Sequence, residues 1–227
     1  MYKIYGLPIS VHTRKVIVCA IEKQIPFEIV PVVPMEPPPG FTDLSPLGKI
    51  PAIAEVDGGD AVLKLADSSV ICAYLERKHP EPAFYPTDAK AYGHALWIEE
   101  YVDGALSQDV LAGFFQKIIR PAMLGEDPDP VVIKEAIENS LPPKLDYAES
   151  LIGSGFLVGD RFGIADVTLA SSMINYLYAG FPLDDKRYPK LTAYLKRLAK
   201  VPSVRRALDI EAQVVKDMSL DGSFFDA

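Results

Sequence analysis

Cysteine is scarce in this chain of 227 residues, which contains only Cys19 and Cys72. Neither belongs to a Cys-x-x-Cys pair or to a Cys/His cluster, so we expect neither a disulfide framework nor a zinc site. Each lies inside a helix-like apolar pattern, which is typical of a small buried side chain. A reducing, cytoplasmic compartment fits this composition best.

The chain also has fewer basic than acidic residues and no long apolar run. The 23 Lys and Arg residues are outnumbered by 31 Asp and Glu residues, which gives a net charge of −8. Nucleic-acid binding depends on Lys and Arg contacts to phosphate, so we expect no nucleic-acid partner. No apolar run approaches the ~20 residues that a membrane-spanning helix needs, and no basic-then-apolar signal segment opens the chain, so we expect no membrane partner either.

The chain does have enough apolar material for real cores, because 49% of its residues are hydrophobic and 24% are charged, which is ordinary for a globular protein. Its first 79 residues alternate between strand-like and helix-like patterns. Two strands separated by a helix predict a βαβ unit with parallel strands, and a later hairpin turns at two glycines. The expected elements are a strand at 2–5, a helix at 13–23, a strand at 27–32, a proline-rich loop at 33–48, hairpin strands at 52–56 and 61–65, and a helix at 67–78.

Beyond about residue 80 the chain shows no strand pattern. We predict an α/β domain over 1–79 with the order βαβ-ββα, a proline-rich linker over 80–87 and an all-helical domain over 88–227. Prolines after residue 119 are expected to end the first long helix, and the polar segment 217–227 is expected to fray. The expected helices run at 88–119, 131–151, 164–179, 189–199 and 202–216.

Two short stretches carry most of the chemical information in the first domain. In Lys49-Ile50-Pro51, a proline at the head of an apolar strand leaves the N–H and C=O of the preceding residue free for an outside partner. Asp67-Ser68 opens a periodic apolar run and should lie at a helix N-terminus, where hydroxyl and backbone N–H groups favour anions. Together they are suited to grip a small extended peptide by its backbone and its carboxylate. An ordinary strand-start proline and an ordinary N-cap are the alternative.

Four motifs, in this order, resemble those of the cytosolic glutathione S-transferase superfamily over roughly residues 2–210. Any one of them is a weak signal, whereas all four at suitable spacing point to one fold. The loop from Tyr5 to Ser10, followed by Thr13-Arg14-Lys15-Val16, looks like the active-site loop of serine-type (theta- and phi-like) members. The other three motifs are Ser45-Pro46-Leu47-Gly48-Lys49-Ile50-Pro51, which is like the family's cis-proline segment, Asp67-Ser68-Ser69-Val70-Ile71, and Gly159-Asp160 followed by Ile164-Ala165-Asp166.

The resemblance implies a thioredoxin-like N-terminal domain that holds glutathione and a helical domain that supplies most of the second-substrate pocket. Ser10 would be the catalytic residue, with a hydroxyl that donates to the glutathione sulfur. A free thiol titrates near ~8.5, so the reactive thiolate needs such stabilisation. Ile50 would pair its backbone with the cysteinyl residue, and Pro51 would fix the turn. Ser68 would hold the γ-glutamyl carboxylate, and Asp67 would face the ammonium group.

The proline-rich loop departs from the family pattern. Where phi-like members carry basic residues, this chain has Pro37-Pro38-Pro39, so the glycine carboxylate of glutathione needs another cation. Lys49 is the first candidate, His12 the second and Arg14 the third. We interpret His12 as a residue that lines the glutathione pocket, because no acidic group that would orient it as a base is evident nearby.

The second-substrate pocket is expected to include Leu7 and Met35 from the first domain and Tyr101 and Phe115 from the second, with Tyr178 as a further candidate. Aromatic residues at helical spacing more often pack in a core, which is the alternative for these positions.

We therefore predict a glutathione transferase that stabilises the glutathione thiolate with a serine hydroxyl and conjugates it to a small hydrophobic electrophile. Glutathione is the co-substrate, no metal is needed, and a peroxidase side activity is compatible with this chemistry. A homodimer is expected by analogy. The alternative is a non-catalytic binding or scaffolding protein of the same fold. The tri-proline loop favours this alternative, whereas retention of Ser10, Pro51, Asp67 and Ser68 favours the enzyme.

Overall fold

The computed structural model describes residues 1–225, so the part of the predicted frayed end at 226–227 lies outside the described residues. The chain divides into two units, Met1–Tyr85 and Pro86–Ala227, and each has its own arrangement of elements. No helix among the described residues combines the length and the apolar character needed to cross a membrane.

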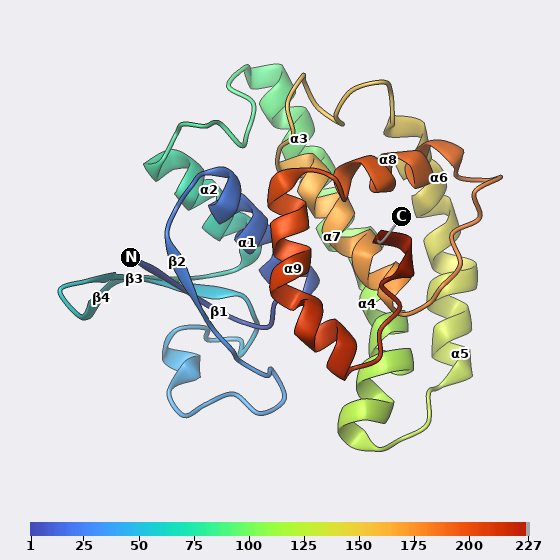
Figure 1. The fold of residues 1–227 in the computed structure, drawn as a ribbon, viewed down its shortest axis with the longest axis horizontal. Coiled ribbons are helices and arrows are strands. Elements are labelled where there is room, and N and C mark those ends of the chain that lie inside the picture. The colour runs from blue at the N-terminus through green and yellow to red at the C-terminus, as the bar shows by residue number, and fades with distance from the viewer. Residues whose placement is uncertain (226–227) are drawn as a thin grey trace. The chain divides into compact units, whose positions relative to one another are not determined.

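The first unit is built on a four-stranded mixed sheet with the strand order β2-β1-β3-β4 (Figure 1). β1 runs parallel to β2, while β3 runs antiparallel to both β1 and β4. A helix joins the two parallel strands, as their common direction requires, and two left-handed glycines turn the hairpin. The predicted βαβ-ββα order is confirmed. The strands are β1 (Tyr2–Tyr5), β2 (Phe27–Val30), β3 (Ala52–Asp57) and β4 (Asp60–Ala66).

Two helices of this unit, α1 (Val11–Glu22) and α2 (Ser68–Lys78), pack against each other and against the sheet. Their inward faces are apolar, and Cys19, Ile71 and Cys72 are fully buried there. Both cysteines are buried side chains of this core, as the sequence predicts. Burial of one large apolar side chain contributes about 1.5–3 kcal/mol, so this core fixes both helices and the loops that precede them.

The proline-rich stretch between β2 and β3 is irregular except for a short 3₁₀-helix, η1 (Phe41–Asp43). Phe41 anchors the stretch, because it is buried together with Val32 and Ala52 and its ring centroid lies 6.5 Å from that of Tyr5. β2 itself ends two residues before the predicted limit. The loop is therefore tied to the sheet by one aromatic side chain, while its prolines are exposed.

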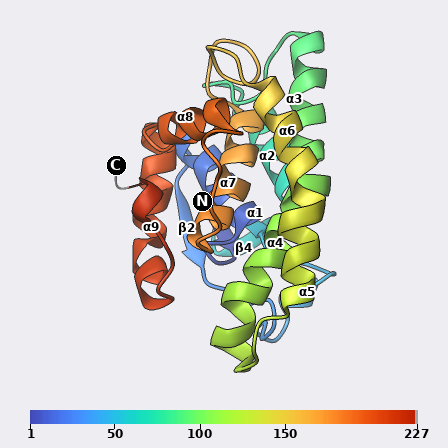
Figure 2. The same ribbon diagram turned by 90° about the vertical axis from the view of Figure 1, so that its right-hand side faces the viewer.

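The described residues of the second unit form helices and no strand, which confirms the prediction for this half of the chain. Figure 2 shows its two long helical runs side by side: α3, η2, α4 and η3 form one run, and α5, η4 and α6 form the other. The segments η2, η3 and η4 are π-helical. The bounds are α3 (Ala89–Tyr101), η2 (Val102–Leu106), α4 (Ser107–Phe114), η3 (Phe115–Leu124), α5 (Pro130–Ile133), η4 (Lys134–Ser140), α6 (Leu141–Leu151), α7 (Ile164–Tyr178), α8 (Pro189–Leu198) and α9 (Pro202–Asp217).

Helix α7 forms the centre of the second unit, since all of its residues are buried and it contacts α3, α4 and α8. Asp166 holds its start. The carboxylate accepts from the N–H of Gly163 at 2.9 Å, from the N–H of Leu157 at 2.8 Å and from the hydroxyl of Tyr194. Burial raises the pKa of Asp166, and these donors oppose the rise by stabilising the carboxylate. Gly163 has no side chain to return a bond, so the helix start is half of a capping box.

The first long helical run extends further than predicted. The expected end near residue 119 is wrong, because the run continues through Pro121 to Leu124 and ends at the left-handed Gly125 (φ 65°). The π-helical segment has displaced hydrogen bonding, which accommodates a residue that has no N–H to donate. Within the same run, a Cβ added at Gly113 would lie 2.5 Å from Cδ1 of Ile137, so this glycine permits close packing of the two helical runs.

The described part of the C-terminal segment is folded, so the prediction that it frays is wrong for residues 217–225. Leu220 is buried, and the N–H of Asp221 donates to the carbonyl of Tyr178 at 3.0 Å. A short 3₁₀-helix, η5 (Ser223–Phe225), follows. The ring of Phe225 lies 5.7 Å from that of Tyr178. A polar composition hid these two apolar anchors in the sequence.

Candidate functional site

The sheet register brings three connections to one edge of the first unit. Tyr5, at the end of β1, pairs with Val30 at the end of β2 and with Ala52 at the start of β3. Ala52 also pairs with Ala66, at the end of β4. Because strand ends that pair lie at the same edge, the segments attached to them begin or end there as well. These segments are 6–10, 31–51 and 67–68, and they hold most of the residues that the sequence singles out.

Ser10 is the N-cap of α1, and its Oγ accepts a long hydrogen bond from the N–H of Thr13 at 3.5 Å. The hydroxyl hydrogen has no acceptor among the described residues, so Ser10 can donate to an outside group. The first turn of α1 contains no acidic residue. The positive end of the helix therefore adds to the attraction of this position for an anion.

The loop that carries Ser10 is braced from within the first unit. The N–H of Ser10 donates to the carbonyl of Leu7 at 2.9 Å. Arg14 is buried, and its Nη2 donates to the carbonyl of Ile9 at 3.2 Å. These two bonds fix the backbone that leads into the serine.

Gly6 lets the same loop approach its neighbours closely. A Cβ added at Gly6 would lie 2.5 Å from Oγ1 of Thr13 and 3.4 Å from Cβ of Ile50. The loop before α1, the first turn of α1 and the segment before β3 therefore meet at this glycine, and any larger residue would push them apart.

Ile50 and Pro51 are joined by a cis peptide bond, and Pro51 is buried at the head of β3. The N–H and C=O of Ile50 have no partner within the described part of the chain, because pairing with β1 begins only at Ala52. The hydroxyl of Ser45 donates to the carbonyl of Lys49 at 2.7 Å and holds the segment before them. A residue just before a strand that keeps its N–H and C=O unpaired can bind the backbone of a peptide-like ligand.

Asp67 is the N-cap of α2, and its φ of 83° and ψ of 127° lie in a region that residues other than glycine rarely adopt. Its Oδ1 accepts from the N–H groups of Ser69 at 2.9 Å and Val70 at 3.2 Å. Its Oδ2 has no partner among residues 1–225. The N–H and hydroxyl of Ser68 likewise have none there, although they lie at the start of an eleven-residue helix. Unpaired donors at a helix N-terminus favour an anion.

The three candidate cations differ in their surroundings. Lys49 is exposed and has no ion pair within the described residues. His12 is half-buried in the first turn of α1. Arg14 is buried and bonded to its own loop, which makes it the least suitable of the three for an outside carboxylate. No three His, Cys, Asp or Glu side chains gather as a metal site among the described residues.

The four predicted contacts of a second substrate lie in different units of the chain. In the first unit, Leu7 is half-buried and Met35 is 43% exposed on the proline-rich loop. In the second, Tyr101 is half-buried, its ring lies edge-on to that of Tyr147 at 4.7 Å, and burial raises its pKa. Phe115 is 37% exposed.

Tyr178, the further candidate, does not fit that role. It is 4% exposed, and its hydroxyl donates to Oε1 of Glu211 at 2.7 Å. Its helix is buried over its whole length, so the aromatic ring belongs to the core of the second unit. The alternative that the sequence offers for such aromatic residues is correct at this position.

Sequence reasoning does not anticipate the contact that ties the two helix starts of the first unit together. Nζ of the buried Lys15 donates to Oγ of Ser69 at 3.0 Å, across 54 positions of sequence. Both residues lie inside recognisable motifs, but no spacing within a motif signals a bond between two motifs. The bracing bond from Arg14 to Ile9 lies within one motif, and the sequence does not signal it either.

Comparisons with known proteins agree on one family. Residues 4–83 match the family model of the glutathione S-transferase N-terminal domain, and residues 114–209 match that of the C-terminal domain. Glutathione S-transferase 3 from Zea mays is 33% identical over 174 residues, which cover 74% of this chain and 75% of the relative. A crystal structure of a glutathione S-transferase from Rhodospirillum rubrum F11 is 26% identical, with a TM-score of 0.81 over 92% of each chain.

A second crystal structure is that of a glutathione S-transferase from Methylobacterium radiotolerans in complex with glutathione sulfonate. It is 26% identical, with a TM-score of 0.74 over 91% of this chain and 93% of the other. The relatives match both halves of the chain, in keeping with the two family models. This chain belongs to the cytosolic glutathione S-transferase superfamily.

Proposed function

We propose that the protein is a glutathione transferase in which the hydroxyl of Ser10 stabilises the glutathione thiolate. The observation that carries this proposal is the position of Ser10, an N-cap whose hydroxyl hydrogen has no acceptor among the described residues. Two further sets of unpaired groups, on Ile50 and Ser68, belong to connections at the same sheet edge. The Methylobacterium radiotolerans relative in complex with glutathione sulfonate supports glutathione as the ligand.

Each part of glutathione has a chemically matched group in the first unit. The unpaired N–H and C=O of Ile50 suit the backbone of the cysteinyl residue. The N–H and hydroxyl of Ser68 suit the γ-glutamyl carboxylate, and Oδ2 of Asp67 suits the ammonium group. Lys49, which is exposed, is the proposed cation for the glycine carboxylate, and the half-buried His12 would line the pocket at the start of α1.

The chemistry follows from the pKa of the thiol. A free thiol titrates near ~8.5, so only a small fraction is thiolate at neutral pH. A hydrogen bond to a charged group is worth about 1.5–3 kcal/mol, which lowers a pKa by about one to two units. The thiolate then attacks an electrophilic carbon. A carbon–sulfur bond forms, and either a leaving group departs with its electron pair or the adduct takes up a proton.

We expect the electrophile to be small and hydrophobic, with Leu7, Met35, Tyr101 and Phe115 as its predicted contacts. The homodimer expected for the family is part of this proposal. Neither feature is needed for thiolate formation, so the two can be tested separately.

The decisive experiment replaces Ser10 with alanine and, as a conservative control, with threonine. Ser10→Ala should raise the pKa of the bound thiol, so that kcat/KM at neutral pH falls about ten- to a hundredfold and recovers as the pH rises. Glutathione affinity, measured by calorimetry, should change little. Ser10→Thr keeps both the hydroxyl and the cap, so it should retain most of the activity.

Two results would redirect the proposal. Unchanged turnover in Ser10→Ala would show that the serine assignment is wrong. Absence of glutathione binding by the unmodified chain at millimolar concentration would favour a non-catalytic protein of this fold, with the exposed tri-proline loop as the departure that disables the site. Thermal unfolding of each variant separates both results from a loss of folding, since removal of an N-cap alone costs about 0.5–2 kcal/mol.

A further inference from the structure

The C-terminal segment of the second unit, residues 218–225, folds back along the end of α7. Ser219 adopts a left-handed conformation (φ 54°), and the N–H of Leu220 donates to the carbonyl of Val215 at 2.9 Å, which reverses the chain after α9. The N–H of Asp221 then bonds to the carbonyl of Tyr178 at 3.0 Å. The segment is therefore fixed at its start by backbone bonds to two different helices.

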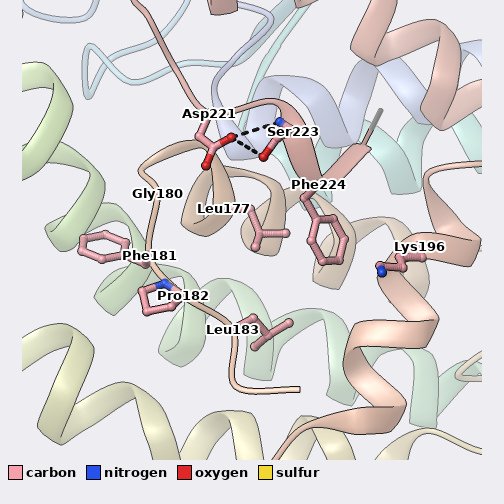
Figure 3. A pocket seen from close by; sticks show the side chains of 9 residues that line it. All are labelled: Leu177, Gly180, Phe181, Pro182, Leu183, Lys196, Asp221, Ser223 and Phe224. Carbon is pink, nitrogen blue, oxygen red and sulfur yellow. Dashed lines mark hydrogen bonds between the residues drawn. The ribbon is translucent and has the colours of Figure 1, made fainter. Parts of the chain in front are cut away.

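An open cavity of about 440 Å³ lies between this segment, the loop after α7, and α8 (Figure 3). Its volume is in the range of small-molecule sites, which are mostly apolar with a few placed polar groups. Five of its nine lining residues have apolar side chains from three parts of the unit. These are Leu177, Phe181, Pro182, Leu183 and Phe224.

One lysine lines this cavity and a second lies beside it. Lys196 lines it from α8, has no acidic partner among the described residues, and holds its Nζ 5.6 Å from the ring centroid of Phe224. Lys117 lies beside the wall, where its Nζ donates to the carbonyl of Gly180 at 3.3 Å and lies 4.7 Å from the ring centroid of Phe181.

Asp221 is the acidic residue of the lining, and its carboxylate is hydrogen-bonded within the C-terminal segment. Its Oδ1 accepts from the N–H of Ser223 at 3.0 Å and from the hydroxyl of Ser223 at 2.6 Å. These two donors, with Lys117 nearby, hold the pKa of Asp221 below its ordinary value. The carboxylate is therefore ionised at neutral pH and fixes the turn into η5. Lys117 and Asp221 offset each other, which leaves Lys196 as the lining charge with no acidic partner among the described residues.

We propose that this cavity binds an amphipathic carboxylate, a small molecule with an apolar body and one anionic end. The body lies against Leu177, Leu183 and Phe224, and the carboxylate pairs with Nζ of Lys196. A bare inorganic anion would leave the apolar lining in water, and a neutral apolar molecule would leave Lys196 without a counter-charge. The site shares no residue with the one that we assign to glutathione, so its existence does not depend on the proposed function.

The test uses 4-phenylbutanoate as the probe and its uncharged amide, 4-phenylbutanamide, as the matched comparison. Calorimetric titration of the full chain should show one-to-one binding of the acid and about two- to fivefold weaker binding of the amide, because an exposed ion pair contributes little more than that. Raising the salt concentration should weaken the binding of the acid more than that of the amide.

Three variants locate the site. Lys196→Gln should bring the affinity for the acid down to that for the amide, whereas Lys200→Gln should leave it unchanged. Lys200 is an exposed lysine just beyond α8 that does not line the cavity, so it controls for net charge. Leu183→Trp adds bulk to the half-buried wall and should abolish binding of both probes. Thermal unfolding checks that each variant is folded.

The proposal is overturned if the acid does not bind at millimolar concentration or if acid and amide bind equally. It is also overturned if Lys200→Gln weakens binding as much as Lys196→Gln. If Leu183→Trp fails to fold, the paired lysine variants still decide the outcome, because both positions are exposed and neither belongs to the core.

Discussion

The Oγ atom of Ser10 accepts the N–H of Thr13 at 3.5 Å and keeps its own hydrogen for an outside acceptor. The two roles of this hydroxyl contribute different free energies. An N-cap contributes about 0.5–2 kcal/mol to stability, and a hydrogen bond to an anion about 1.5–3 kcal/mol. The bond from Thr13 is long, so its contribution belongs to the lower part of that range. Loss of the hydroxyl should therefore affect the chemistry more than the fold.

Lys49 gives a residue-scale prediction, because it is the exposed cation beside the cis-proline segment. We expect Lys49→Gln to weaken glutathione binding by up to about fivefold, the usual limit for an exposed ion pair. The variant should bind γ-glutamylcysteine, which has no glycine carboxylate, as well as the unmodified chain does. Calorimetric titration of both ligands measures the difference.

The matched control for this prediction is Lys64→Gln, an exposed lysine on β4. It removes the same charge from the first unit and should leave both affinities unchanged. If Lys49→Gln weakened both ligands equally, the lysine would not contact the glycine carboxylate, and His12 would become the next candidate.

Glu55 on β3 gives a pH-dependent prediction. It accepts from Lys78 and, at 2.5 Å, from the hydroxyl of Tyr74. These two bonds hold the pKa of Glu55 below its ordinary value of 4.5. A carboxyl group whose pKa is lower in the folded state stabilises the fold above the unfolded pKa, and this stability is lost as the pH falls through the folded pKa.

We therefore expect Glu55→Gln to lower the free energy of unfolding above pH 4.5 and to have progressively less effect as the pH falls below that value. Denaturant unfolding across a pH series measures the difference between the two proteins. Glu36→Gln, at an exposed position in the proline-rich loop with no ion pair among the described residues, is the control. A constant difference at every pH would show that the charge of Glu55 is not the cause.

At the scale of elements, three helices end in the same way. A residue with left-handed φ follows the last turn: Gln24 after α1 (54°), Gly180 after α7 (66°) and Ser219 after α9 (54°). In each case the N–H of that residue and of the next one bond back to the last turn, at distances between 2.7 and 3.3 Å. This is the Schellman arrangement, in which glycine is the preferred residue.

The series predicts opposite effects at equivalent positions. Gln24→Gly and Ser219→Gly should each raise the free energy of unfolding by about 0.5–1 kcal/mol, because a left-handed side-chain residue costs about 1–2 kcal/mol and the added freedom of the unfolded chain cancels part of the gain. Gly180→Ala should lower it by about 1 kcal/mol. Urea unfolding of the three variants tests the series, and a rise for Gly180→Ala would contradict it.

The same elements show which features could be read from the sequence. The hairpin was predictable, because two mostly apolar runs flank the glycine turn Asp57-Gly58-Gly59-Asp60. The passage of a helix through Pro121 and the folding of residues 217–225 were not, because both depend on tertiary surroundings that local propensity does not contain. Leu220 and the aromatic Phe225 were the available signals in that polar tail.

Some features of the candidate site could likewise be read from the sequence, and others could not. Its binding groups lie in short contiguous motifs, so Ser10, Ile50 and Ser68 could be named from the sequence. The bond from Lys15 to Ser69 could not, because it crosses 54 positions. The positive φ of Asp67 was also hidden, since such a conformation is expected of glycine.

At the scale of the whole molecule, binding and catalysis can be separated by their effects on stability. A ligand that binds only the folded chain stabilises it by RT ln(1 + [L]/Kd), which is about 2.7 kcal/mol at a hundred times Kd. Binding rests on Ile50, Asp67 and Ser68 in our proposal, whereas thiolate formation rests on Ser10. Stability in the presence of glutathione and turnover therefore report on different residues.

We expect Ser10→Ala to keep the stabilisation by glutathione and to lose most of its turnover, while Ser68→Ala should lose much of both. Removal of a hydrogen bond to a carboxylate costs about 1.5–3 kcal/mol, so Ser68→Ala should bind about ten- to a hundredfold more weakly. At the same glutathione concentration its stabilisation should fall to about 0.4–1.4 kcal/mol. Denaturant unfolding with and without glutathione measures this, and equal stabilisation of the Ser68→Ala variant and the unmodified chain would mean that the start of α2 does not hold the γ-glutamyl carboxylate.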